Sequence, residues 1–157
     1  MKLAQARVEE CSENRISHGC MALELGFHLR RSQVAAFKHF AQTVTMAEGI
    51  TPGLYGTIQV IANNPGLTQS ALAEAMDVDR SSIVKVVNQL EEKGLISRDA
   101  VPNDKRSYSL RLTAQGRLSL KRIEDSVMRQ DQEFSAALSE SERETLIGLL
   151  KRLYQQD

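Results

Sequence analysis

The stretch LTQSALAEAMDVDRSSIVKVVNQLEEKGLISRDAVPNDKRSYSLRLTAQG, residues 67–116, carries the local signals of two short helices followed by a hairpin. Thr68 and Asp79 are candidate N-caps, because their side-chain oxygens can accept hydrogen bonds from the unpaired N–H groups of a first helical turn. Gly94 follows the last apolar residue of the second predicted helix, and a glycine at this place predicts a left-handed C-cap. The expected order is a short helix, a tight turn and a second helix that ends near Lys93.

The chain after Gly94 changes from a helical period to the period of a strand. Tyr108, Leu110 and Leu112 alternate with polar side chains, as in a strand with one buried face. The tip at residues 103–106 carries one carboxylate and two cations. Two strands are expected, Leu95–Ala100 and Ser107–Leu112. With one hairpin among helices, the sequence predicts a mainly α fold.

Amphipathic helices are predicted on both sides of this stretch. The helix expected at about residues 20–47 has apolar side chains in two neighbouring rows, so we expect it to be covered on two sides. Further helices are expected at about 52–63 and 114–138, and a last one after residue 139. Their candidate N-caps are Thr51, Thr113 and Ser139, and Glu142 completes a capping box with Ser139.

The composition argues against several classes of protein. The chain of 157 residues has 20 Lys+Arg and 20 Asp+Glu, and a net charge of zero argues against a histone-like, non-specific nucleic-acid binder. Residues 80–111 nevertheless hold seven cations and four anions, a local surplus that overlaps the hairpin. Trp is absent and aromatic residues make up 4%, which disfavours a sugar-binding or base-stacking surface built on aromatic rings.

Motifs for catalysis, metal binding and membrane insertion are absent from the sequence. There is no HExxH, P-loop, GxGxxG or nucleophile elbow, so we expect no catalytic residue, metal or cofactor. The spacing of Cys11 and Cys20 suits neither a metal site nor a disulfide framework. No apolar run approaches the roughly 20 residues of a membrane span, and the N-terminus lacks the apolar core of a signal peptide. These absences predict a cytoplasmic protein.

Residues 67–116 resemble the core of the MarR family of winged helix-turn-helix transcription regulators. The matching motifs are LA in the first helix, DRSS at the start of the second, LEEKGLISR, NDKRS at the wing tip and LTAQG after the hairpin. GITPGLYGTIQVIANNPG upstream fits the family's second helix, and the resemblance covers roughly residues 25–153. It implies an N-terminal arm and first dimerisation helix (1–50), a DNA-binding domain (51–113) and C-terminal dimerisation helices (114–157).

The second helix of this module suits the major groove of DNA, which is about 12 Å wide. Its face opposite the apolar stripe carries short hydroxyls, long donors and one apolar side chain at helical spacing. Ser and Gln side chains can reach base edges, Lys85 can reach guanine or a phosphate, and Val84 can meet a thymine methyl. Many family members have Thr at the position of Val84, so a hydrogen-bonding role is not carried over there. The alternative is an ordinary solvated polar face.

The wing tip also has two interpretations. The resemblance implies that Asp104 orients the wing and that Arg106 enters the minor groove, whose narrow form concentrates negative potential. Alternatively, Asp104 pairs with Arg106 or Arg98 and only fixes the turn, as an exposed ion pair worth about 0–1 kcal/mol. The predicted DNA-binding residues are Ser70, Arg80, Ser81, Ser82, Val84, Lys85, Gln89, Asp104, Lys105 and Arg106.

The family resemblance implies an effector pocket between the dimer helices and the winged helix. In GFHLRRSQVAAFKHF, residues 26–40, paired arginines stand beside aromatic rings, which suits an anion with an apolar body. Aromatic acids and aromatic acyl-CoA thioesters both fit, and the stretch resembles the branch that regulates aromatic-acid catabolism through CoA thioesters. Alternatively, Arg30 and Arg31 are solvated or pair with Glu24 or with acids of a dimer partner. The predicted effector-binding residues are Phe27, His28, Arg30, Arg31, Ser32, Phe37 and His39.

Together these features predict a ligand-responsive transcription regulator, a repressor of a double-stranded DNA operator. Broad apolar stripes on the first and the last two helices predict a two-fold homodimer that reads pseudo-palindromic half-sites about 34–36 Å apart. One alternative is a redox-sensing regulator acting through Cys20, because a helix start can lower a thiol pKa. The peroxide-sensing branch of the family places its cysteine near the position of Phe27 instead. Another alternative is an effector-free architectural DNA binder.

Overall fold

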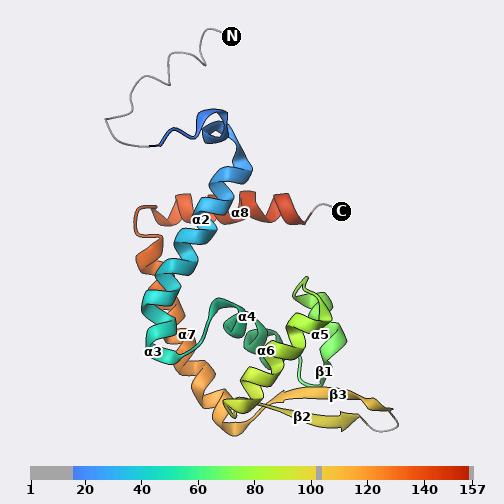
Figure 1. Ribbon diagram of the computed structural model, residues 1–157. Coiled ribbons are helices and arrows are strands. Elements are labelled where there is room, and N and C mark those ends of the chain that lie inside the picture. The colour runs from blue at the N-terminus through green and yellow to red at the C-terminus, as the bar shows by residue number, and fades with distance from the viewer. Residues whose placement is uncertain (1–15, 102–103, 156–157) are drawn as a thin grey trace. The chain divides into compact units, whose positions relative to one another are not determined.

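The computed structural model of the protein describes residues 16–101 and 104–155, and the side chains of residues 101–107 lie outside that description. The described chain forms two compact units, of which the first ends at Ala35 and the second begins at Ala36. The second unit holds the predicted helix-turn-helix and hairpin (Figure 1). Within the described ranges, no helix has both the length and the apolar character that crossing a bilayer requires.

The helix predicted at about 20–47 starts later than predicted, at Leu25, and contains a π turn, while its predicted end is confirmed. A short 3₁₀ helix, η1 (Gly19–Leu23), is followed by extended backbone at Glu24 and then by α2 (Leu25–Phe40). A π-helical turn, η2 (Ala41–Thr45), and α3 (Met46–Glu48) complete the region. The Thr43 hydroxyl donates to the His39 carbonyl oxygen at 2.8 Å, a local bond that competes with the helical ladder where the turn widens.

The next three helices start at the predicted caps. They are α4 (Pro52–Asn63), α5 (Gln69–Ala75) and α6 (Arg80–Glu92). The side chains of Thr51, Thr68 and Asp79 each accept a hydrogen bond from a backbone N–H of the following turn. Gly94 has φ 68°, which confirms the left-handed end of α6.

The wing belongs to a three-stranded antiparallel sheet in the order β1-β3-β2 (Figure 1). The predicted hairpin is formed by β2 (Ile96–Val101) and β3 (Asp104–Leu112), and β3 begins earlier than the predicted Ser107. The third strand, β1 (Leu67–Thr68), was not predicted and pairs Leu67 with Leu110. A strand of only two residues is too short to show an alternation of apolar and polar side chains, so β1 can be recognised only from its pairing with β3.

The core of the second unit lies between the helix-turn-helix, the sheet and the next helix. Leu72, Val87, Leu90 and Leu110 have no exposed surface, in agreement with the inward positions predicted for α5, α6 and β3. The predicted inward residue Val86 is only half-buried. The buried stripe fixes α6 to the sheet and leaves its opposite face in solvent.

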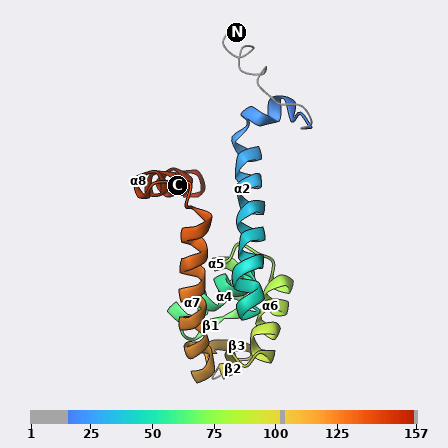
Figure 2. The ribbon, with the colours of Figure 1, turned by 90° about the vertical axis from the view of Figure 1, so that its left-hand side faces the viewer.

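The two C-terminal helices begin where they were predicted to begin, but α7 ends earlier than predicted. α7 (Ala114–Phe134) follows the cap Thr113 and ends at Phe134 rather than at the predicted Leu138. The Ser135 hydroxyl donates to the Asp131 carbonyl oxygen at 2.6 Å and satisfies an acceptor of the last turn. α8 (Glu140–Tyr154) starts with the predicted capping box, contains no buried residue, and turns away from the axis of α7 (Figures 1 and 2).

Candidate nucleic-acid interface

The start of α6 is held by one carboxylate with three donors. Asp79 Oδ1 accepts from the Ser81 hydroxyl at 2.5 Å and from the Ser82 N–H at 2.9 Å, and Oδ2 accepts from the Ser82 hydroxyl at 2.6 Å. The hydrogen bonds from the Ser81 hydroxyl, the Ser82 hydroxyl and the Ser82 N–H hold the pKa of the Asp79 carboxyl well below its ordinary value. Both hydroxyl protons are therefore used inside the cap, and the two serines present acceptor lone pairs outward.

The exposed face of α6 carries the remaining residues predicted for it. Arg80, Val84, Lys85 and Gln89 are all exposed, and Ser70 is exposed on α5. Ile83, Val87 and Leu90 occupy the opposite, buried face. The structure thus separates the two faces of α6 as the periodicity predicts, and the DNA contacts of its outer face remain predictions.

The far end of α6 is joined to β2 through Arg98. Its Nη2 donates to Asn88 Oδ1, and its Nε lies 3.4 Å from Glu91 Oε2. Arg98 therefore has partners on α6, which does not favour the alternative in which it serves Asp104. This link was not visible in the sequence, because it joins residues of two elements that only the fold brings together.

The described part of the wing contains one cross-strand ion pair. Arg111 Nε on β3 lies 3.4 Å from Asp99 Oδ2 on β2, and both side chains are about half-exposed. Asp104, Lys105 and Arg106 belong to β3, and their side chains lie outside the described residues. Their roles at the minor groove therefore remain predictions.

Three predicted effector residues of the first unit, Phe27, His28 and Arg31, lie together around the Phe27 ring. The Arg31 guanidinium carbon lies 5.6 Å from the centroid of the Phe27 ring, and Arg31 Nη1 is 3.2 Å from His18 Nε2. The Phe27 ring is also 4.9 Å from the His18 ring and 5.5 Å from the His28 ring, measured between centroids. Arg31 thus pairs with a histidine rather than with Glu24, and His18 is a member that was missing from the predicted set.

Arg30 and Ser32 are exposed on α2 in the same unit. Cys20, the residue of the redox alternative, is exposed in η1 and not in the first turn of a long helix. Cys11 lies outside the described residues.

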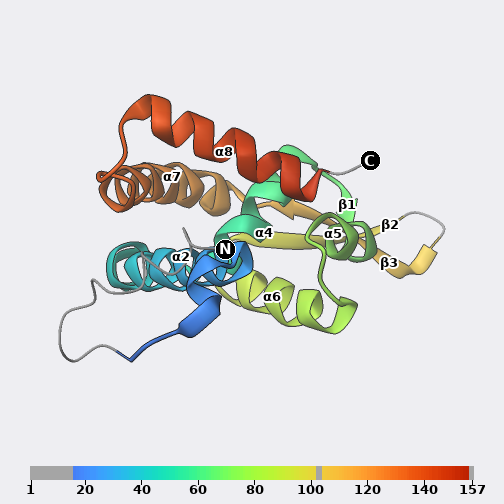
Figure 3. The same cartoon turned by 90° about the horizontal axis from the view of Figure 1, so that it is seen from above.

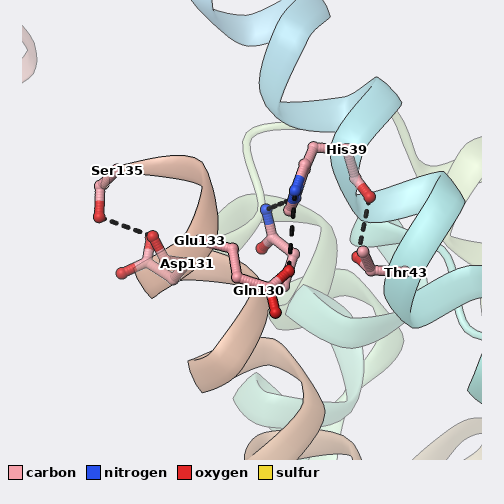
Figure 4. A network of polar contacts seen from close by, with 6 residues as sticks. All are labelled: His39, Thr43, Gln130, Asp131, Glu133 and Ser135. Atoms are coloured by element: carbon pink, nitrogen blue, oxygen red, sulfur yellow. Dashed lines mark hydrogen bonds and ion pairs between the residues drawn. The ribbon is translucent and has the colours of Figure 1, made fainter. Parts of the chain in front are cut away.

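His39 lies in the second unit, where its side chain contacts residues of α7. Gln130, which is buried, donates from Nε2 to His39 Nδ1 at 3.2 Å, and His39 Nε2 lies 3.9 Å from Glu133 Oε2 (Figure 4). The His39 and Phe134 rings are 6.0 Å apart between centroids. These contacts tie the end of α2 to α7. Phe37, the other predicted residue of this unit, is 52% exposed.

A cavity of about 670 Å³ between α4 and α7 was not predicted from the sequence. Its apolar lining includes Phe40, Tyr55 and Val127. Its charged lining consists of the acids Glu124, Asp125 and Asp131 with Lys121. Three carboxylates against one cation do not favour an anionic ligand at this place.

Comparison with known proteins identifies the family. Residues 50–108 match the family model of MarR. Over 140 residues the chain is 73% identical to a protein assigned as a transcriptional regulatory protein for the hcr operon of Thauera aromatica, covering 89% of this chain and 84% of that protein. The chain belongs to the MarR family. This MarR-family protein is thus a transcription regulator, and its relatives are regulators rather than enzymes.

Solved MarR-type structures confirm the winged-helix fold. The repressor CouR bound to a 23-mer DNA duplex has a TM-score of 0.84 at 27% identity, covering 90% of this chain and 100% of CouR. PcaV from Streptomyces coelicolor, in complex with its natural ligand, has a TM-score of 0.76 at 29% identity, covering 90% of this chain and 96% of PcaV. CouR has also been solved bound to p-coumaroyl-CoA, with a TM-score of 0.82 at 26% identity over 91% of this chain and 100% of CouR.

Proposed function

We propose that this MarR-type regulator is a repressor that acts as a two-fold homodimer and is released from its operator by a small anionic effector, an aromatic acid or an aromatic acyl-CoA. The observation that carries the proposal is the position of the Arg31 guanidinium over the Phe27 ring, with His18 and His28 beside the same ring. A cation beside aromatic surface suits a ligand that joins a negative group to an apolar ring.

The DNA-binding part of the proposal rests on α6 and the wing. The exposed residues of α6 enter the major groove, and Arg106 at the wing tip enters the minor groove. The three hydrogen bonds of the Asp79 cap support this role, because a reading helix must hold its first turn in place while base edges are contacted. The ligand-bound relatives, CouR with p-coumaroyl-CoA and PcaV with its natural ligand, support a response to a small molecule.

The dimer is supported by apolar surface that the described chain leaves uncovered. Leu25, Val34 and Phe37 on α2 are more than half exposed, and α8 contains no buried residue. Large apolar side chains left exposed along a helix are what an interface with a partner would cover. The effector acts by favouring a dimer whose half-site spacing no longer matches the operator, because a ligand shifts an equilibrium only through unequal affinity for its two states.

The effector proposal is tested on a duplex that the protein itself selects from a random pool. Anisotropy of this labelled duplex is measured with benzoate, 4-hydroxybenzoate and their CoA esters. We expect at least one of them to weaken binding by about tenfold or more, and Arg31→Gln to bind DNA normally without responding. Arg129→Gln, an exposed arginine on α7, is the matched control and keeps the response. Silence across all four compounds refutes the proposal, and peroxide release that Cys20→Ser abolishes supports the redox alternative.

The wing proposal is tested with Arg106→Ala on the same duplex. Removal of one groove-reading arginine is expected to weaken binding by about 1–3 kcal/mol, roughly five- to 160-fold. Light scattering measures the oligomeric state in parallel and is expected to be unchanged. If the variant loses its oligomeric state or its fold, the tip has a structural role and the assignment to the minor groove is wrong.

A further inference from the structure

A second cavity, of about 560 Å³, lies on the winged-helix unit between the end of α4, β3 and the first half of α7. Its floor is apolar and is formed by Ile61, Ala62, Leu112 and Leu120. Its rim contains the cations Arg111, Arg117 and Lys121 and one acid, Glu124. None of the residues predicted to bind DNA or effector lines it, so it has no place in the function proposed above.

The polar side chains around this cavity are partly engaged by neighbours, since Arg111 Nε lies 3.4 Å from Asp99 Oδ2. Arg117 Nη1 donates to the Leu112 carbonyl oxygen at 3.0 Å, which uses one of the five guanidinium donors. Glu124 Oε1 accepts from Gln59 Nε2 at 2.8 Å, so the one acid of the rim is drawn toward α4. Arg111 Nη2 lies only 3.6 Å from where a Cβ on Gly66 would stand, so its guanidinium is held beside the loop that precedes β1.

We propose that this cavity binds a small organic oxyanion, a carboxylate or a phosphate ester that carries an apolar body about the size of one ring. Arginine forks bind both headgroups through paired hydrogen bonds, and Lys121 adds a point charge. The apolar floor excludes water from the other end of such a ligand. The volume falls within the range of about 300–1,000 Å³ that is usual for small-molecule sites.

A small ligand fits this cavity better than the DNA backbone does. Figures 2 and 3 show α6 and α7 on opposite sides of the β2–β3 ribbon, and the cavity is lined from the α7 side. An oxyanion bound there competes with Asp99 for the Arg111 guanidinium, which lies 3.4 Å from that carboxylate. Occupancy therefore changes the ion pair that joins the two strands of the wing.

The proposal is tested by nuclear magnetic resonance titration of the ¹⁵N-labelled full chain with benzoate and with phenyl phosphate. We expect saturable shifts of the amides of Ile61, Ala62, Leu112 and Leu120, at least fivefold weaker in Lys121→Gln and in Arg117→Gln. Arg129→Gln, on the same helix outside the cavity, and Arg31→Gln, in the predicted effector cluster, keep the wild-type affinity. Whichever of the two compounds binds more tightly identifies the headgroup.

Inorganic phosphate and benzyl alcohol test the two halves of the ligand separately, and both are expected to bind at least tenfold more weakly than the better compound. Inorganic phosphate binding equally well overturns the assigned apolar body. Shifts that persist in both cavity variants, or that vanish in Arg31→Gln, place the ligand elsewhere and overturn the site. Equal loss of DNA affinity for all sequences in Lys121→Gln, without any ligand shifts, shows instead that this surface contacts the duplex.

Discussion

Gly116 lies where the first turn of α7 passes against the end of the α6–β2 connection. A Cβ at this position would stand 1.9 Å from the Leu95 carbonyl oxygen, and that oxygen also accepts from the Thr113 N–H at 3.1 Å. The Thr113 hydroxyl donates to the Gly94 carbonyl oxygen at 2.7 Å and accepts from the Gly116 N–H at 2.9 Å. The glycine of the LTAQG motif is therefore required by a close approach between helix and backbone.

Gly116→Ala is expected to force α7 away from Leu95 and to destabilise the fold by about 1–3 kcal/mol or more, because the clash is with backbone that has little room to move. Urea unfolding measures the change. Gly148→Ala is the matched control, because Gly148 lies inside α8 with no atom within 4 Å of an added Cβ. There alanine should be neutral or stabilising by up to about 1 kcal/mol. Equal effects of the two substitutions would contradict the packing argument.

At the level of elements, the starts of helices were predictable and several other boundaries were not. The capping side chains of Thr51, Thr68, Asp79 and Thr113 bind N–H groups only three residues away, so the sequence contains the whole signal. β1 could not be predicted, because two residues become a strand only beside β3. The late start of the N-terminal helix depends on the extended backbone at Glu24, and the widened turn at 41–45 lies within it; the apolar period continues through both.

The cap of α6 gives a pH dependence that can be measured. The pKa of the Asp79 carboxyl is lowered in the folded chain, first by the Ser81 hydroxyl and then by Ser82. A lowered folded pKa means that the cap stabilises the fold above the unfolded value of about 3.9, and that this contribution is lost as pH falls from there toward the folded value. Asp79→Asn removes the charge but keeps an acceptor, so its Tm should be lower than that of the wild type above pH of about 5.

The difference in Tm between wild type and Asp79→Asn should shrink as the pH is lowered below about 4. Thermal scans of both proteins across this range measure it, and Glu142→Gln provides a comparison at a second capping carboxylate, whose pKa is also lowered by the Ser139 hydroxyl and N–H. A difference between the two proteins that stays constant down to the lowest pH would show that the Asp79 charge does not stabilise α6.

At the scale of the molecule, the sequence indicated candidate surfaces that lie on one element and gave no sign of the cavities, which are assembled from several. The outer face of α6 follows from the period of one helix. The cavities beside α7 could not be predicted in this way, because their walls come from α4, β3 and α7. Gln59 and Glu124, for example, are hydrogen-bonded to each other although they are 65 residues apart in the sequence. The predicted effector set shows the same limit: it named Phe27 and Arg31 on α2 and missed His18, which lies before η1.

The proposed dimer can be tested through the apolar surface of α8. Leu146 on α8 is 45% exposed in the single chain, as expected for an apolar residue that a partner would cover. In a two-fold interface each substitution occurs twice, so Leu146→Asp buries two carboxylates in apolar surroundings, which is strongly unfavourable without partners. We expect light scattering at micromolar concentration to show the mass of a monomer, and circular dichroism to show the helical content of the wild type.

The monomeric variant should also lose DNA affinity, because the second half-site is no longer bound within the same complex. Loss of this linkage typically weakens binding by about 10²–10⁴-fold. Leu118→Asp is the control, since Leu118 is 77% exposed on α7 and lies outside the predicted stripe; it receives the same charge without changing mass or affinity. If Leu146→Asp keeps both the wild-type mass and the wild-type DNA affinity, α8 is not part of the interface and the partner must cover other apolar surface.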